Sequence, residues 1–406
     1  MDVSLCWTVH ATISATDFFG VRMIRYMDLG GDRTLNDIVM AGSHDAGITT
    51  GASNAQTQVL DIGAQARAGV RFFDLRVAAF SSGAMSYGAK QVELKAFHAD
   101  GMIHKKDKDK TRSVVGFQGT APITRSKLKF GEGAEGMGLR KMLEDARGFV
   151  TSADYSGEFL ILKFDKCTNW ELIAATCRSV LGGTIYKKGG NLNIKKLSDL
   201  SGSVICAFME SGYDALKTPG SNVNITKIKN LYKPPSDYDN NFQGLQYWGS
   251  GGTGINNKGY EGKIRENIEK QKKVMASAQT GVAPKTAMFS RKVTPGCAAS
   301  DPRAIGVMYW TTTGLKKSIL TRDATMWNDN NKSGLQSIWQ SGFDIFMGEA
   351  LPQHVPMTPS AGGIVKMFMP NVVMIDFADE PKCKHIYDLN DLATARLIDI
   401  CQKMGM

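Results

Sequence analysis

Charged and polar residues with catalytic potential interrupt or follow apolar runs that predict buried strands. They are His44, Arg76, His98, Lys163 and Asp376. A histidine titrates near neutral pH, so two histidines can supply the base and the acid of one proton-transfer reaction. Arginine presents a rigid fork of donors that matches the oxygens of a phosphate. The combination favours a functional cluster capable of acid–base chemistry.

Each of these residues also has an ordinary structural explanation. A single histidine after a strand is more often a hydrogen-bonded structural residue than a catalyst. Asp74 and Arg76 could form a buried pair that braces one strand, and Asp376 could cap the segment that follows it. A charged residue in a buried strand is costly unless it is paired, and the carboxyl ends of the strands form the active-site face of β/α barrels. The convergence of several such residues on one face favours a functional cluster.

The elements that would position these residues are short buried strands separated by helices. Apolar runs predict strands over 37–44, 70–77, 92–98, 158–164, 204–209, 305–310 and 372–377. Apolar residues at helical spacing predict helices over 139–150, 170–180 and 264–278. This order favours a mostly parallel α/β arrangement. Because several connections lack a helical pattern, above all 215–260, we expect a distorted TIM-type (β/α) barrel with irregular connections and long loops.

No internal repeat or clear linker divides the chain of 406 residues. Residues 1–36 are mixed apolar and polar, with strand-like alternation over 5–9. We expect them to form an N-terminal extension packed on a barrel of residues 37–406. The glycine cluster at 249–254 is not followed by the Gly-Lys-Ser/Thr of a phosphate-binding loop, which favours a mobile loop.

Composition excludes a disordered chain and indicates an anionic partner. Hydrophobic residues make up 42% of the sequence and charged residues 22%, enough for a substantial core. The formal net charge of +10 favours nucleic acid, an acidic membrane surface or a phosphorylated substrate without choosing among them. The basic run at 105–112 alternates in sign, so a solvated loop is favoured over a dedicated polyanion site. We expect no nucleic-acid partner.

Seven scattered cysteines without a Cys-x-x-Cys pair predict reduced thiols rather than a disulfide framework. The first residues lack the basic segment of a secretory signal, and no apolar run approaches the roughly 20 residues that cross a bilayer. We therefore expect a soluble protein that is cytoplasmic or exported without a cleaved signal, with peripheral membrane contact.

Several segments resemble a known enzyme family. Residues 38–49, which include Gly-Ser-His-Asp-Ala-Gly after an apolar strand, resemble the first catalytic segment of the phosphatidylinositol-specific phospholipase C X-domain superfamily. Residues 69–76 are similar to the second segment in its bacterial branch, and His98 falls where the second histidine belongs. Residues 157–163 and 371–377 resemble the fourth and last barrel segments, so the matches span most of the chain.

The resemblance implies a role for each matching residue. His44 would take the proton from the sugar 2-hydroxyl, and His98 would protonate the departing diacylglycerol oxygen. Asp376 would orient His44. Asp45 would support His98 and pair with Arg76, which would hold the phosphate.

The resemblance also implies a reaction without a metal or other cofactor. The calcium-using branch of the family places carboxylates at the positions of Arg76 and Lys163, and an asparagine at that of Asp45. Calcium requires several hard oxygen ligands. Two cations at those positions leave no such cage, so Arg76 would replace the metal.

The half of the site that would contact the head group departs from the bacterial pattern. After 204–209 bacterial members carry an arginine that contacts the inositol ring, whereas this chain has Glu210, and the aspartate expected near Gln246 is not evident. Tyr247, Trp248 and Trp310 could stack on a ring, enter a membrane or belong to the core. The expected substrate contacts are Lys163, Glu210, Tyr247 and Trp310.

The favoured function is cleavage of phosphatidylinositol to an inositol cyclic phosphate and diacylglycerol, by a monomer at an anionic membrane surface. One alternative is the same scaffold acting on another phospholipid or a soluble diester. A second, from a different class, is a non-catalytic module that binds anionic lipid. This alternative predicts binding without turnover, and the joint presence of both histidines and Arg76 disfavours it.

Overall fold

A computed structural model describes thirteen stretches of the chain: 23–51, 53, 55–81, 92–99, 111–114, 117–120, 123–124, 133–231, 238–249, 253–255, 304–314, 318–328 and 371–391. Four sequence features lie wholly or largely outside these residues. They are the strand-like alternation over 5–9, most of the basic run at 105–112, the middle of the 249–254 glycine cluster, and the predicted helix over 264–278.

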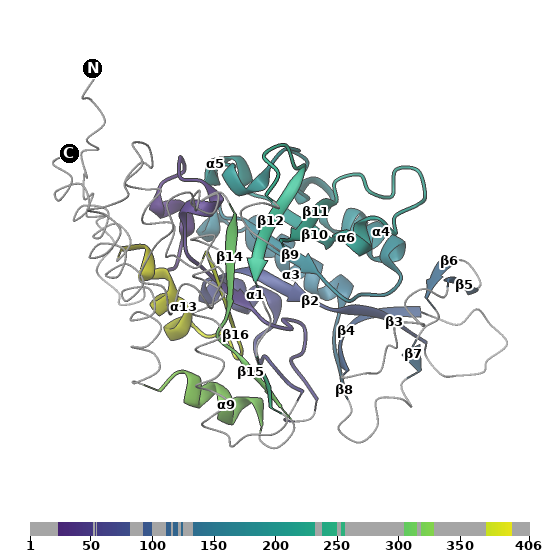
Figure 1. Ribbon diagram of the computed structural model, residues 1–406, viewed down its shortest axis with the longest axis horizontal. Helices are drawn as coiled ribbons and strands as arrows, with labels where there is room; N and C mark the ends of the chain where they lie inside the picture. The colour runs from purple at the N-terminus through teal and green to yellow at the C-terminus, as the bar shows by residue number, and fades with distance from the viewer. Residues whose placement is uncertain are drawn as a thin grey trace, which may run out of the picture.

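Eight parallel strands close into a barrel (Figure 1), in the order β1, β16, β14, β12, β11, β10, β9 and β2. The strands are β1 (Met40–Ser43), β2 (Val70–Leu75), β9 (Leu160–Phe164), β10 (Val204–Met209), β11 (Thr226–Asn230), β12 (Gly244–Gly249), β14 (Ile305–Tyr309) and β16 (Val372–Ile375). Strands β1, β2, β9, β14 and β16 are buried at every residue, as expected of parallel strands covered on both faces. The predicted TIM-type barrel is confirmed.

Helices of unequal length lie between the barrel strands, and one more, α13, follows the last strand. They are α1 (Ile62–Ala68), α3 (Leu139–Val150), α4 (Trp170–Leu181), α5 (Leu197–Leu200), α6 (Glu210–Tyr213), α9 (Ile319–Met326) and α13 (Glu380–Tyr387). Short 3-10 turns accompany them: η1 (Tyr26–Leu29), η2 (Leu35–Asp37), η4 (Ala153–Tyr155), η5 (Gly182–Thr184) and η6 (Leu192–Ile194). In α3 the apolar residues at helical spacing are all buried, which confirms the predicted amphipathic helix over 139–150.

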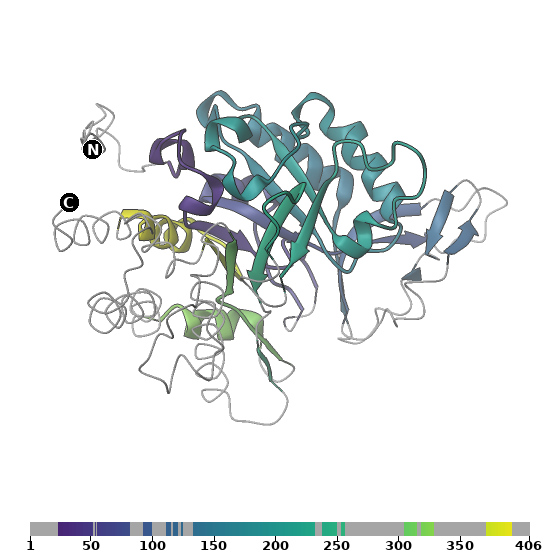
Figure 2. The same ribbon diagram turned by 45° about the horizontal axis from the view of Figure 1, so that its top comes forward.

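A second sheet lies beside the barrel and corrects one prediction (Figures 1 and 2). Its strands run in the order β7 (Ile123–Thr124), β3 (Val77–Ser81), β4 (Val92–Ala99) and β8 (Gly133–Gly138). The prediction of a barrel strand over 92–98 is wrong, because β4 pairs antiparallel with β3 and β8. The barrel position next to β2 is taken by β9. We call the β7-β3-β4-β8 sheet the satellite sheet.

The satellite sheet belongs to the long connection between β2 and β9. The chain leaves β2 at Leu75, forms the hairpin of β3 and β4, and returns through β8 directly into α3. Two further small sheets pair β5 (Thr111–Val114) with β6 (Phe117–Thr120), and β13 (Thr253–Ile255) with β15 (Thr312–Gly314). Because the satellite sheet starts from the carboxyl end of a barrel strand, it stands at the end where active sites form in this fold.

Two barrel strands were missed within residues 215–260. Strand β11 alternates buried and partly exposed residues in the sequence Thr-Lys-Ile-Lys-Asn, so it lacks a continuous apolar run. Strand β12 contains the buried Gln246, whose backbone N–H and C=O are hydrogen-bonded to the side chain of Asn193 at 2.8 and 2.6 Å. In the sequence a glutamine suggests an exposed loop, although here it is buried and its polar groups are hydrogen-bonded. This explains why strand β12 was not predicted.

Tyr26 and the cysteines of the described segments are buried in the protein core. Tyr26, in η1, is fully buried and its hydroxyl contacts the backbone N–H of Ala41 at 3.1 Å. The cysteines of the described segments are all buried free thiols: Cys167, Cys177, Cys206 and Cys383. Among the described residues, no helix has the length and apolar character required to cross a bilayer.

Candidate active site

His44 and Asp376 meet because two neighbouring barrel strands end in register. Ser43 and Ile375 are the last residues of β1 and β16, and they are partners in the parallel ladder. The next residue in each chain segment is therefore carried to the same point, and the Nδ1 of His44 lies 2.9 Å from the Oδ1 of Asp376. The carboxylate accepts the Nδ1 proton, which directs the Nε2 of His44 away from Asp376 and leaves it as the basic atom.

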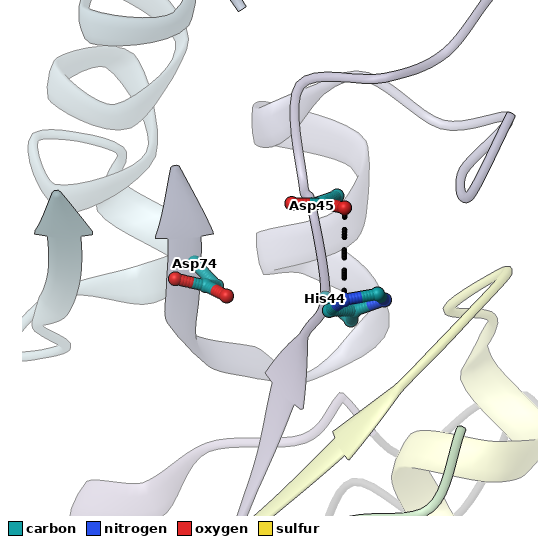
Figure 3. A group of neighbouring side chains, drawn as sticks. All are labelled: His44, Asp45 and Asp74. Atoms are coloured by element: carbon teal, nitrogen blue, oxygen red, sulfur yellow. Dashed lines mark ion pairs between the residues drawn. The ribbon is translucent and has the colours of Figure 1, made fainter. Parts of the chain in front are cut away.

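Asp45 lies at the centre of the site. Its Oδ2 is 2.8 Å from the Nδ1 of His98 and 3.6 Å from the Nε2 of His44, so both imidazoles contact one carboxylate oxygen. Its Oδ1 is 2.9 Å from the Nε of Arg76. Figure 3 shows Asp45 above His44 on the segment that follows β1, with Asp74 on the adjacent strand. The two histidines and the arginine predicted from sequence are therefore brought together by a single side chain.

Two glycines allow the satellite sheet to approach the barrel closely enough for His98 to reach Asp45. The backbone N–H of Met137 in β8 donates to the carbonyl of Gly47 at 2.9 Å. A Cβ on Gly136 would fall on that carbonyl, and a Cβ on Gly47 would lie 2.5 Å from the Cβ of Ala96. Any larger residue at either position would separate the two sheets. The backbone N–H of Phe97 also donates to the carbonyl of Arg76 at 3.0 Å, which fixes the neighbour of His98.

The charges of the site stabilise one another in the protein interior. Burial by itself lowers the pKa of His44, but the carboxylates of Asp45 and Asp376 outweigh it and raise that pKa to about 9. Burial would raise the pKa of Asp45, yet Arg76, followed by His44 and His98, holds it well below its usual range. In the free protein at neutral pH the site therefore contains an ionised Asp45 and a protonated His44.

A second ion pair lies next to this cluster. Asp74 and Lys163 are partners in the ladder between β2 and β9, and the Nζ of Lys163 lies 2.9 Å from the Oδ1 of Asp74. Burial lowers the pKa of Lys163, but the adjacent carboxylate of Asp74 contributes most to raising it well above its ordinary value. The ammonium also lies 5.6 Å from the ring centroid of Tyr247. Lys163 and Tyr247 are thus held together at the carboxyl ends of β9 and β12.

His44, Asp45 and Asp74 offer ligand atoms within 4.8 Å of one another, a spacing compatible with a metal ion. Each group already has a partner, however. Asp45 contacts Arg76, Asp74 contacts Lys163, and the Nδ1 of His44 contacts Asp376. A calcium ion requires several carboxylate or carbonyl oxygens that are not shared with cations. The donor set therefore does not fit a calcium site.

No protein-family model and no curated protein sequence matches the chain. A structure of a mutant phosphatidylinositol-specific phospholipase C from Staphylococcus aureus resembles it with 15% identity and a TM-score of 0.42, over 88% of this chain and 95% of that chain. A second structure of the S. aureus enzyme, concerned with its membrane binding, has 15% identity and a TM-score of 0.46, over 90% and 96%. A calcium-dependent phosphoinositol-specific phospholipase C from Pseudomonas sp. has 11% identity and a TM-score of 0.32, over 62% and 82%.

The likeness concerns the fold alone.

The structure corrects the prediction for Trp310. Its side chain is fully buried, and its Nε1 donates to the carbonyl of Met326 in α9 at 3.1 Å. Buried indoles normally find such a partner within the protein core. This burial contradicts the prediction that Trp310 contacts substrate or membrane. The burial of Trp310 depends on contact with α9, a helix that comes later in the chain. The sequence alone does not show this contact.

Glu210 begins α6, immediately after β10, and its side chain is 43% exposed. Its carboxylate lies 3.8 Å from the Nζ of Lys227, a residue of β11. No described contact joins Glu210 to His44, His98 or Arg76. Its role as a substrate contact remains a prediction.

Two residues at the mouth were not among the predicted site residues. The ring of Tyr309 meets the imidazole of His44 edge-on, with centroids 6.0 Å apart. The carboxylate of Asp165 lies 3.5 Å from the Nζ of Lys163. Tyr309 is the last residue of β14 and Asp165 directly follows β9, so the rule that singled out Asp376 would have found both.

Proposed function

We propose that the protein cleaves a phosphodiester by attack of a neighbouring hydroxyl of the same substrate, and that phosphatidylinositol is its favoured substrate. One observation supports the proposal above all others: two imidazoles contact the same oxygen of Asp45, and a guanidinium contacts the other. A base, an acid and a fixed positive charge are the three groups that internal attack on a phosphodiester requires.

In the proposed reaction, the neutral form of His44 removes the proton from the attacking hydroxyl through Nε2. The hydroxyl oxygen then forms a bond to phosphorus, and the bond from phosphorus to the alcohol oxygen breaks. His98, in its protonated form, gives its proton to that oxygen, so the products are a cyclic phosphate and a free alcohol. Arg76 balances the charge on the phosphoryl oxygens. Asp376 stabilises the imidazolium that forms on His44.

We further propose that this reaction needs no metal ion. Arg76 is held against Asp45 at the place where charge develops on the phosphoryl group, and Lys163 neutralises Asp74 beside it. These two cations occupy the positions that would otherwise have to supply carboxylate ligands. The prediction that no cofactor takes part rests on the same pairing.

The site would act on lipid at an anionic membrane surface. The net charge of +10 favours binding to such a surface. We propose that Lys163 and Tyr247 contact the substrate from the neighbouring strands, and that the protein acts as a monomer with no nucleic-acid partner.

A related substrate is favoured by one feature of the head-group side. Glu210 lies beside β10, where the resemblance to bacterial enzymes calls for an arginine, and its carboxylate is 3.8 Å from Lys227, which also pairs with Asp214 at 3.0 Å. This arrangement suits a head group other than inositol, so another phospholipid or a soluble diester is the second candidate.

Phosphorus NMR of purified protein with phospholipid vesicles tests the proposal. Vesicles of phosphatidylinositol should give inositol cyclic phosphate, while matched vesicles of phosphatidylcholine and phosphatidylglycerol should remain intact. Cleavage of another diester alone would replace phosphatidylinositol as the substrate. Vesicle binding with no phosphorus product from any diester would overturn the enzymatic proposal in favour of a lipid-binding module.

A further inference from the structure

Two backbone turns beside the catalytic pair are held in an unfavourable conformation. Asp45, directly after His44, has φ 42°, and Phe377, directly after Asp376, has φ 45°. The left-handed region costs a residue other than glycine about 1–2 kcal/mol. Such turns persist only where surrounding contacts enforce them. The contacts that enforce these two turns therefore also determine how His44 faces Asp376.

One buried amide binds both turns. The Nε2 of Gln58 donates to the carbonyls of His44 and Ile375 at 3.1 and 3.2 Å. Its Oε1 accepts from the backbone N–H of Ala378 at 2.9 Å. Gln58 has no exposed surface, and these bonds use both of its donors and one of its acceptor sites. The side chain joins the end of β1 to both sides of the Asp376 turn.

The preceding residue adds a second connection between the same turns. The Oγ1 of Thr57 donates to the carbonyl of Asp45 at 2.9 Å. The carbonyl of Thr57 accepts from the backbone N–H of Phe377 at 2.7 Å. Thr57 and Gln58 thus bind the backbone on both sides of each left-handed residue.

We infer that Gln58 is a positioning residue that holds the imidazole of His44 against the carboxylate of Asp376 in the alignment needed for proton transfer. Its effect on turnover rests on the proposed function, but its effect on the geometry of His44 does not. Gln58 touches no reacting atom. It acts by fixing the two backbone segments that carry the base and the group that orients it.

The chain provides a matched control at the opposite end of the same strand. The Nδ2 of Asn390 donates to the carbonyls of Val39 and Tyr387, both at 2.8 Å, and its Oδ1 accepts from the N–H of Val39 at 2.9 Å. Asn390 is 1% exposed. Like Gln58, it binds two backbone carbonyls and one backbone N–H through its side-chain amide, next to the amino end of β1. Loss of its amide should destabilise the fold without moving His44.

The experiment compares Gln58→Met with Asn390→Leu, two substitutions that keep approximate size and remove the amide. The titration of His44 is followed by NMR of the imidazole without substrate. The charged groups that face His44, which are Asp45, Asp376 and Arg76, are unchanged in both variants. We expect Gln58→Met to lower the pKa of His44 by about one unit, because its contact with Asp376 loosens. The pKa in Asn390→Leu should equal that of the wild type.

The kinetic readout uses the phosphodiester cleaved by the wild type. After correction for the fraction of neutral His44 in each variant, Gln58→Met should lower kcat by roughly 10- to 100-fold with little change in KM, since small displacements of a catalytic group have effects of this size. Asn390→Leu should retain kcat. Equal His44 titration and equal kcat in the two variants would show that Gln58 only braces the fold, and would overturn the proposal.

If Gln58→Met does not fold, Thr57→Val takes its place. This variant loses one hydrogen bond of the same connection, so it should move the His44 titration in the same direction by a smaller amount. An unchanged titration in a folded Thr57→Val would also overturn the proposal. A wild type that cleaves no phosphodiester would refute the proposed function, whereas the substrate-free titration would still decide the role of Gln58.

Discussion

Arg71 lies in strand β2, near its amino end, and Arg76 directly follows the carboxyl end of the same strand. Arg71 faces outward to the surrounding helices. Its Nε contacts the Oε2 of Glu158 at 2.7 Å, and its other nitrogens donate to three backbone carbonyls. Its guanidinium also lies 4.7 Å from the ring centroid of Phe149. Every nitrogen of Arg71 is therefore occupied inside the protein.

Arg76 faces the mouth of the barrel and is incompletely bound. Its Nε and the Oδ1 of Asp45 lie 2.9 Å apart, but the contact lacks hydrogen-bond geometry, and neither atom has another hydrogen-bond partner among the described residues. The side chain remains 20% exposed. A buried ion pair alone consequently does not identify a site. The distinguishing feature is a charged group with hydrogen-bonding capacity left for a ligand.

Arg71→Met should have the largest effect, and on stability rather than chemistry. Glu158 would remain buried without its cation, which costs about 3–5 kcal/mol of unfolding free energy. Denaturant unfolding measures the loss. The folded fraction should keep the wild-type kcat, since Arg71 lies on the outer face. A large loss of kcat in fully folded protein would abolish the distinction between the two arginines.

His44→Ala should have the next largest effect, and on chemistry rather than stability. Removal of a general base lowers kcat by at least ~10², or about 2.7 kcal/mol. The rate of cyclic phosphate formation measures it. Unfolding of the variant serves as the control, because the activity loss must not arise from a smaller folded population. A nearly active variant would show that another group removes the proton.

The pH dependence of kcat/KM should test whether His44 is the general base of the site. Because the pKa of His44 is raised to about 9, only a small fraction is neutral and able to act as a base at pH 7. Over the pH range in which His98 keeps the proton that it donates, the rate should therefore rise about tenfold per pH unit below that pKa. Asp376→Asn removes one cause of the raised pKa, so the rise should move to lower pH. A pH profile that does not move in Asp376→Asn would be inconsistent with His44 as the base.

Treatment with a chelator should have the smallest effect. The oxygens of Asp45 and Asp74 already contact Arg76 and Lys163, so removal of divalent ions should leave turnover unchanged. Initial rates with and without EDTA provide the measurement. Loss of activity with EDTA and recovery with calcium would contradict the role given to Arg76.

The sequence predicted the strand-end residues well because their positions follow from local pattern. His44 and Asp376 each come after an apolar run, and the parallel pairing of those runs was enough to bring them together. His98 reached the predicted site by an unpredicted route. Its strand contains Glu93 and Lys95 between apolar residues, an alternation typical of a strand with one exposed face, whereas β14 and β16 are apolar throughout, and β4 pairs antiparallel with β3.

The supporting residues could not be predicted in the same way. Gln58 lies in an irregular segment, and its three partners come from the ends of two strands that are far apart in the sequence. Trp310 is continuous with the apolar run of β14, so its burial beneath α9 depends on packing rather than on pattern. Long-range contacts of this kind leave no periodic signal in the sequence.

The contact between Gly47 and Gly136 has a consequence for how this protein can change over generations. The proposed base and acid belong to two separately built sheets, and one of the contacts between these sheets is the hydrogen bond from Met137 to Gly47, beside which Gly47 and Gly136 leave no room for a side chain. A methyl group at either position would push the sheets apart by its own thickness. Selection for turnover would thus act on Gly47 and Gly136, which touch neither imidazole, as strongly as on residues that meet the substrate.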